Sequence, residues 1–184
     1  DRVVSATDGH LMFYNITDHI PFQVNKKCLQ LVDNEPKISL SSLPEYVLRL
    51  KVHQSGIKAI THKETSPGTF KIYTCGDDNA IGTCSIQFNE STGGLSGYIS
   101  DFNRNAAAST ITSCALLQDG KYLVTTSVDQ VVKMWNISSD KISLHKSQYV
   151  TVADTGSSDQ VAIADGSVLI LIGGVGLIIL KTEA

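Results

Sequence analysis

The sequence predicts an all-β protein built from repeated strand–turn–strand units. Val, Ile and Thr account for 47 of the 184 residues, and β-branched residues favour strands. Hydrophobic residues make up 42% and charged residues 18% of the chain, a balance that excludes a disordered protein. The third observation is a recurring pattern in which an Asp precedes an Ile by eight residues. No amphipathic helical period appears between these units.

Three units carry this pattern, and their Asp residues are Asp8, Asp78 and Asp129. A β-rich run stands before each Asp and an alternating run follows it, which predicts strand, tight turn, strand. A fourth unit, Val168–Leu180, has Gly174 where the Asp would stand. We expect it to form a buried hairpin, because a membrane span needs about 20 apolar residues and this run is shorter.

The spacing of the units predicts a domain organisation. The three Asp residues and Gly174 lie 70, 51 and 45 residues apart, and a four-stranded propeller blade repeats every ~40–45 residues. The first interval is longer because it holds a proline-containing inserted loop at 18–45. We therefore expect the C-terminal portion of a β-propeller with about four degenerate four-stranded blades. The predicted ranges are a blade remnant at 1–52, blades at 53–106 and 107–150, and a final blade at 151–184.

This order of motifs resembles the WD-repeat family of β-propellers. A blade of that family carries a His in the first connecting loop, a Ser or Thr on the second strand, an Asp in the next turn and a Trp on the third strand. The resemblance implies that these side chains hydrogen-bond to one another and fix the packing of the blade. The residues that match this structural blade motif are Asp8, Tyr14, His53, Asp78, Ser127, Asp129 and Trp135.

The repeats depart from the family pattern at several positions. In the second unit Gly76 stands at the Ser position and Cys84 at the Trp position. In the third unit Ala107 stands where the His would be, and in the first unit Tyr14 takes the place of the Trp. Each blade is therefore expected to keep only part of the hydrogen-bonded motif.

A narrower resemblance is to the C-terminal end of the WD-repeat partner subunits of tRNA 2′-O-ribose methyltransferases that act on the wobble nucleotide. In these subunits an Asp-containing run precedes a Gly-Gly-x-Gly-Leu hairpin at the end of the chain. The stretches that carry the resemblance are Val52–Lys58, Cys75–Asp78, Thr126–Gln130, Trp135, Val152–Asp154 and Gly173–Leu177.

This resemblance implies a non-catalytic scaffold that binds the methyltransferase and helps to position tRNA. The S-adenosylmethionine site would lie in the partner, so we expect no catalytic residue, no cofactor and no metal in this chain. We also expect no DNA partner and no membrane span. The formal net charge of −3 and a pI near 5.9 fit a chain that acts mainly through protein contacts. Lys51, Gln54 and Lys58 surround one connecting loop and are the expected partner contacts.

Two other functions stay open on the sequence alone. The same blades would serve a WD-repeat adaptor in another pathway, such as endosomal trafficking or ubiquitination. A metal-dependent enzyme would need ligands such as His53, His62, Cys75 and Cys84, which the pattern spreads over separate strands. The four cysteines show no Cys-x-x-Cys spacing, and we expect them to be reduced and the protein to be cytoplasmic. The chain begins at Asp1 rather than Met, and we expect it to be the tail of a longer propeller protein.

Overall fold

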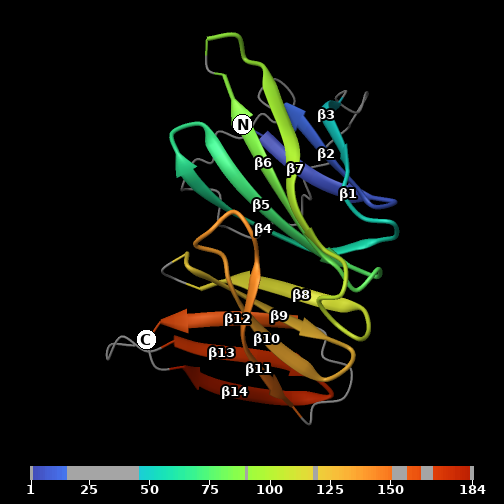
Figure 1. Cartoon of the computed structure of the whole chain (residues 1–184), viewed down its shortest axis with the longest axis vertical. Coiled ribbons are helices and arrows are strands. Elements are labelled where there is room, and N and C mark those ends of the chain that lie inside the picture. Colours follow the sequence, from blue (N-terminus) through green and yellow to red (C-terminus); the bar gives the residue numbers. More distant parts are fainter. Residues whose placement is uncertain are drawn as a thin grey trace, which may run out of the picture.

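The computed structural model describes residues 2–15, 46–89, 91–117, 120–150, 157–162 and 168–182. The predicted inserted loop at 18–45 and Cys28 lie outside these ranges. Within them the chain forms four antiparallel sheets and no helix (Figure 1). The prediction of an all-β fold is confirmed. No helix in the described ranges is long and apolar enough to cross a membrane.

The first sheet, in the order β1-β2-β3, and the second sheet, in the order β4-β5-β6-β7, come from the N-terminal part of the chain. Their strands are β1 (Arg2–Thr7), β2 (His10–Asn15), β3 (Tyr46–Lys51), β4 (Ile57–Ser66), β5 (Thr69–Gly76), β6 (Ile81–Phe88) and β7 (Leu95–Asn103).

The third sheet has the order β11-β10-β9-β8 and the fourth sheet the order β12-β13-β14. Their strands are β8 (Ile111–Leu116), β9 (Tyr122–Ser127), β10 (Val131–Asn136), β11 (Ser143–Tyr149), β12 (Ser157–Ala162), β13 (Val168–Gly174) and β14 (Gly176–Thr182). The second and third sheets thus have four strands each, whereas the described parts of the first and fourth have three.

Tight turns at the predicted Asp positions connect β1 to β2, β5 to β6 and β9 to β10 in the first three sheets. In the first sheet Asp8 and Gly9 both have positive φ, 46° and 71°, as a two-residue hairpin turn requires. In the second and third sheets the turns are longer, and the left-handed residue is the one after the Asp, Asn79 (φ 62°) or Gln130 (φ 64°). The Asp8 turn is therefore a different turn type from the other two.

The sheets pack face to face in chain order, and a separate apolar cluster fills each of the three interfaces (Figure 1). Leu11 and Phe13 from the first sheet meet Cys84 and Ile86 from the second. Since neighbouring residues of a strand face opposite sides, each inner sheet contributes one face to the preceding interface and one to the next.

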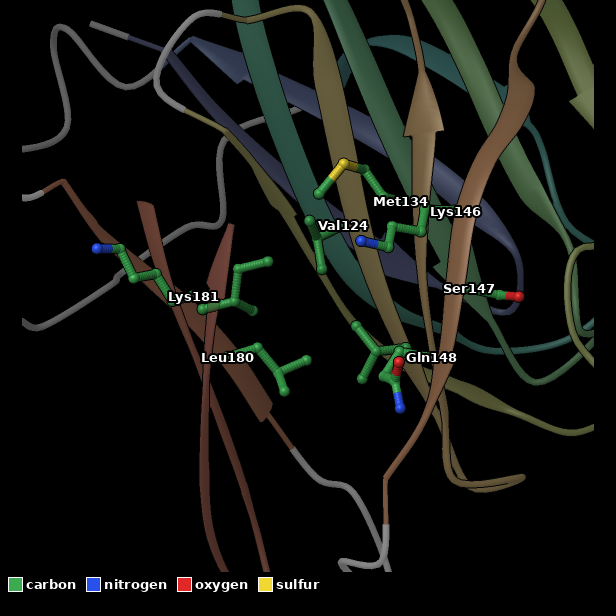
Figure 2. A pocket seen from close by; sticks show the side chains of 9 residues that line it. Val124, Met134, Lys146, Ser147, Gln148, Leu180 and Lys181 are labelled. Carbon is green, nitrogen blue, oxygen red and sulfur yellow. The ribbon is translucent and has the colours of Figure 1, made fainter. Parts of the chain in front are cut away.

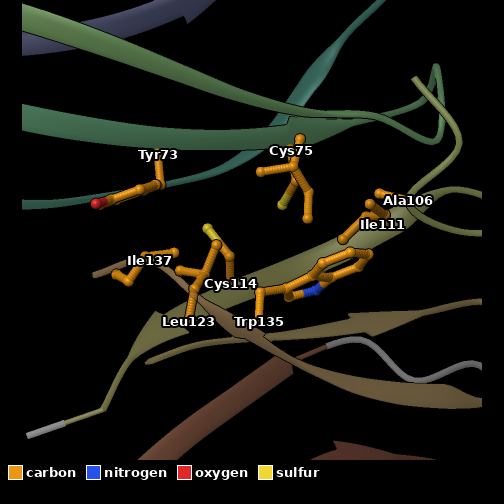
Figure 3. Close-up of a cluster of buried hydrophobic side chains, with 9 residues drawn as sticks. Tyr73, Cys75, Ala106, Ile111, Cys114, Leu123, Trp135 and Ile137 are labelled. Carbon is orange, nitrogen blue, oxygen red and sulfur yellow. The ribbon is translucent and has the colours of Figure 1, made fainter. Parts of the chain in front are cut away.

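The interface between the second and third sheets contains Trp135 and two facing cysteines (Figure 3). Cys75 on β5 is fully buried, and Cys114 on β8 is 9% exposed. The two thiols are hydrogen-bonded to each other, and this bond together with burial raises the pKa of Cys75. Both are free thiols, as is Cys84 in the neighbouring cluster.

The fourth sheet corrects the prediction of a buried hairpin. Ile170 and Ile172 are buried against the third sheet. On the opposite face, Leu177 is 64% and Ile179 54% exposed, and Val175 at the turn is 75% exposed. The sequence of this hairpin is apolar on both faces, but the described residues cover only one of them.

Candidate functional site

The polar motif of the second sheet centres on His53. Its Nδ1 lies 2.8 Å from the Asp78 carboxylate, and its Nε2 lies 2.8 Å from the hydroxyl of Thr74. The backbone amide of Gln54 donates to the second carboxylate oxygen of Asp78 at 2.9 Å. His53 is 1% exposed and Thr74 is fully buried. The imidazole is thus held on both nitrogens, so it ties the connecting loop to the Asp turn and to strand β5.

The contacts of Asp78 determine its protonation. Burial acts to raise the pKa of its carboxyl, but the hydrogen bonds from His53 and from the Gln54 and Ala80 amides outweigh burial. The pKa of Asp78 therefore lies below its ordinary value, and the group is ionised at neutral pH. Its donors belong to its own sheet and loop, so this carboxylate has a structural role.

The third sheet keeps a different part of the motif. The indole N–H of Trp135 donates to the hydroxyl of Thr125 at 2.9 Å, in a buried bond. The Asp129 carboxylate accepts the amide of Ala108 at 2.8 Å and that of Val131 at 3.0 Å. Asp129 therefore joins its turn to the preceding loop, as Asp78 does in the second sheet.

Ser127, the serine that the sequence assigns to the motif, does not contact Trp135 through a described bond. Its hydroxyl donates to the carbonyl of Ser109 and accepts the amide of Asp129, both at 3.2 Å. The hydroxyls that the structure places against His53 and Trp135 belong to Thr74 and Thr125, which sequence reasoning missed. Each of these threonines stands four residues before the motif Asp, and this shared offset was the available signal.

Asp8 and Tyr14 in the first sheet behave differently from their counterparts. The backbone carbonyl of Asp8, rather than its carboxylate, accepts a bond from Lys51 Nζ at 2.7 Å and lies 3.0 Å from His10 Nδ1. Tyr14 is half-buried, and its hydroxyl contacts the Met12 sulfur at 3.6 Å. Asp78 and Asp129 thus join their turns to the preceding loops through their carboxylates, whereas Asp8 contacts Lys51 and His10 through its backbone carbonyl.

The second and third sheets also differ at the position two residues before Cys84 or Trp135. Gly82 occupies it in the second sheet, where a Cβ would overlap Val52 and lie 2.8 Å from the Thr74 hydroxyl. Lys133 occupies it in the third sheet, donates to the Ala106 carbonyl at 2.5 Å and lies 5.7 Å from the Trp135 ring centroid. In the second sheet Gly82 therefore leaves space beside the His53 imidazole. In the third sheet, which has no equivalent His, the Lys133 side chain occupies the corresponding position.

The expected partner contacts Lys51, Gln54 and Lys58 are all exposed. They lie on and beside the loop that joins β3 to β4, close to the Asp turns of the first two sheets. Lys58 forms an ion pair with Asp77 at 3.3 Å, with the two side chains 48% and 37% exposed. This loop is a polar surface whose two lysines contact neighbouring turns and remain exposed.

The residues considered for a metal site are not brought together. Cys75 faces the third sheet, whereas Cys84 faces the first, and His62 is exposed on β4. In the described part of the chain, no group of three or more His, Cys, Asp or Glu side chains could hold a metal ion. The hypothesis of a zinc set made of His53, His62, Cys75 and Cys84 therefore has no geometric support.

Comparisons with known proteins agree with this geometry. Residues 99–136 match the model of the family described as WD domain, G-beta repeat. A comparison with curated proteins finds no match. The WD40 beta propeller domain of Doa1 is 12% identical with a TM-score of 0.58, and the match covers 100% of this chain and 47% of that chain. The beta-propeller domain of Cps50 (Swd1) from Myceliophteria thermophila is 11% identical with a TM-score of 0.65, and the match covers 100% of this chain and 51% of that chain.

The chain thus spans about half the length of these two solved propellers. At such low identity the structural likeness establishes the fold alone, and it agrees with the four stacked antiparallel sheets. The fold is that of part of a β-propeller, and the segment 99–136 in it matches a WD repeat.

Proposed function

We propose that this chain is part of a non-catalytic WD-repeat scaffold that binds a tRNA 2′-O-ribose methyltransferase and helps to position tRNA for methylation of the wobble nucleotide. We further propose that the protein acts in the cytoplasm. The propeller fold and the WD-repeat match support a scaffold that acts through protein contacts. The specific partner rests on the ordered sequence motifs, which end in the Gly173–Leu177 hairpin.

One observation favours a scaffold over an enzyme. His53 and Asp78 are side chains suited to acid–base chemistry, but they bond to each other, and the second ring nitrogen of His53 bonds to the buried Thr74 hydroxyl. A catalytic group has to reach substrate, and a general base does so within about 3 Å. His53 is 1% exposed, so its position suits a role in fixing the blade.

The test of the proposal is affinity purification of the full-length protein from its own cells. We expect a tRNA ribose methyltransferase to be recovered, and loss of the protein to lower 2′-O-methylation at the wobble position. Recovery of other partners without a methyltransferase, with wobble methylation unchanged, would contradict this function and favour a WD-repeat adaptor in another pathway.

The loop between β3 and β4 is tested separately with K51E and K58E. Exposed charges at an interface are worth up to about 1 kcal/mol each, so the double variant should recover about tenfold less methyltransferase. K141E reverses an exposed lysine in the β10–β11 connection and serves as the control. If the double variant and K141E recover equal amounts, this loop is not the contact, whatever the outcome for the methyltransferase itself.

A further inference from the structure

Two buried cysteines face each other across the interface between the second and third sheets. Cys75 lies near the end of β5, and Cys114 lies on β8. Figure 3 shows their side chains directed into the space between the two sheets, and their thiols are hydrogen-bonded to each other. The proposed scaffold function uses neither thiol, so the pair calls for an explanation of its own.

The surroundings of this pair are formed by described residues of both sheets. The second and third sheets have four strands each, and β5 packs against β8. Ala106, Leu123 and Trp135 belong to the same buried cluster as the two cysteines. A covalent bond between the sulfur atoms would therefore join two sheets that are otherwise held together by side-chain packing and by a few polar contacts.

The apolar cluster favours a neutral product of thiol chemistry. Its other buried members are uncharged, and a thiolate, a sulfinate or a metal thiolate would bring a net negative charge into it at a high desolvation cost. A disulfide is neutral and differs from two thiols only by the loss of two hydrogen atoms. Forming its S–S bond of about 2.05 Å from a thiol–thiol contact needs side-chain rotation rather than a new strand register.

We propose that Cys75 and Cys114 form a reversible disulfide that links the second and third sheets when the protein meets a hydroperoxide such as hydrogen peroxide. The two thiols together lose two electrons and two protons as the S–S bond forms. The O–O bond of hydrogen peroxide breaks, and its two oxygens leave as two molecules of water. A dithiol reductant returns two electrons and two protons and becomes a disulfide itself, so in a reducing compartment the link is transient.

The difference in exposure assigns different roles to the two thiols. Cys114 is 9% exposed and Cys75 is fully buried, so peroxide reaches the sulfur of Cys114 first. The Cys114 thiolate attacks one peroxide oxygen and becomes a sulfenic acid, while the other oxygen leaves as hydroxide and takes up the thiol proton. The Cys75 sulfur then attacks the Cys114 sulfur, and the proton of Cys75 leaves with the displaced hydroxide as the second water.

The disulfide would lie beside the loop that carries the expected partner contacts. Cys75 is followed directly by Gly76 and by Asp77, which forms an ion pair with Lys58. A bond at this point removes states in which the two sheets are apart. Oxidation should therefore keep this end of the interface closed, whichever protein the scaffold binds.

The test treats the full-length protein with hydrogen peroxide under native conditions and maps disulfide-linked peptides by mass spectrometry after digestion without reductant. We expect a linked pair containing Cys75 and Cys114 that disappears on treatment with dithiothreitol. Cys84 is also a buried free thiol, but it faces the first sheet. The link between Cys75 and Cys114 should be about tenfold more abundant than any link to Cys84, because facing thiols react at a high effective concentration.

Met134 provides an internal measure of the peroxide dose. Its side chain lines a groove of about 130 Å³ between the third and fourth sheets, together with Lys146 and Leu180 (Figure 2). Peroxide converts a methionine to its sulfoxide without the help of a neighbouring thiol. Samples are therefore compared at equal oxidation of Met134.

Three variants separate the roles of the thiols. In C75S the sulfenic acid at Cys114 has no partner and should be trapped by dimedone, whereas C114S should give little adduct at Cys75. C84S should form the disulfide like the wild type. Hydrogen exchange of β5 and β8 should slow about tenfold after oxidation of the wild type and stay unchanged in C75S. Circular dichroism shows whether each variant is folded.

Four outcomes would overturn the proposal. They are no link between Cys75 and Cys114 in the folded wild type at a dose that oxidises Met134, links to Cys84 of equal abundance, equal dimedone adducts in C75S and C114S, and unchanged hydrogen exchange of β5 and β8 after oxidation. Failure of the methyltransferase proposal would leave these results unchanged, because none of them is read from a partner.

Discussion

Two buried threonines are the residues on which the polar motifs of the inner sheets depend. Thr74 contacts His53, and Thr125 accepts the Trp135 indole N–H. Sequence reasoning found His53 and Trp135 because these residue types stand out, but it placed the hydroxyl partner two residues before the Asp. The side chain that reaches the ring comes from the same face of the strand two residues earlier. A linear motif does not give that geometry.

At the residue scale, T125V should lower the free energy of unfolding by about 1–3 kcal/mol. The valine keeps the volume but leaves the indole N–H of Trp135 buried without its acceptor. Urea denaturation followed by tryptophan fluorescence measures the change, since Trp135 is the single Trp of the chain. T125S retains the hydroxyl and should lose less stability than T125V. Equal losses would show that the bond contributes nothing.

The lowered pKa of Asp78 predicts an acid-dependent stability. Its hydrogen bonds favour the ionised form in the folded state, so the unfolded state binds more protons between the folded pKa and the ordinary value of 3.8. The contribution of Asp78 is fully present above that ordinary value and is lost as pH falls through the folded pKa. Urea midpoints between pH 2.5 and 6 should fall less steeply for D78N than for the wild type. Parallel curves would refute this role.

At the scale of the element, the strand positions follow from the sequence and their exposure does not. The strand–turn–strand units predicted around Asp8, Asp78 and Asp129 form as β1–β2, β5–β6 and β9–β10, because the β-rich runs and the turn residues between them both limit the strands. The hairpin at Val168–Leu180 also forms, but its apolar pattern cannot tell which face meets a neighbour. Which face is buried depends on how the sheets pack against one another, and this packing involves residues far from the hairpin in the sequence.

Gly76 tests the pairing of β4 with β5. A Cβ at Gly76 would overlap the backbone carbonyl of Gly56, which cannot move without breaking the pairing. We expect G76A to lower the free energy of unfolding by about 3 kcal/mol. The matched variant G56A would place its Cβ 2.7 Å from a carboxylate oxygen of Asp77, and this exposed side chain can rotate away. G56A should therefore cost about 1 kcal/mol or less, as measured by chemical denaturation. Similar losses would contradict this account.

At the scale of the whole molecule, the main contacts between sheets in the described ranges join neighbours in the chain order, so stability depends on the interfaces between these sheets. Sequence spacing predicts repeated blades because each unit repeats its turn. It does not predict the side chains that join one sheet to the next, because these come from distant and dissimilar positions. Asp101 of β7, for example, accepts the backbone amide of Ile142, 41 residues away, at 2.8 Å.

D101A removes this link between the second and third sheets. The Ile142 amide is left half-buried without its acceptor, so we expect a loss of about 1 kcal/mol and a broader thermal transition as the sheets uncouple. The control D140A breaks the Lys71–Asp140 ion pair between the same sheets. The Asp140 side chain is 92% exposed, and its loss should not change the melting curve measurably. A larger effect of D140A than of D101A would contradict this description of the interface.

Chemical labelling of the facing thiols of Cys75 and Cys114 can measure how fast the second and third sheets separate. An alkylating reagent reacts with the thiolate. The hydrogen bond to Cys114 and burial both raise the pKa of Cys75, so the closed interface should react very slowly. Labelling then proceeds at the rate at which the second and third sheets part, or in proportion to the time they spend apart. With Cys28 and Cys84 replaced by Ser, mass spectrometry over hours should show both thiols gaining label together, and D101A should shorten the half-time.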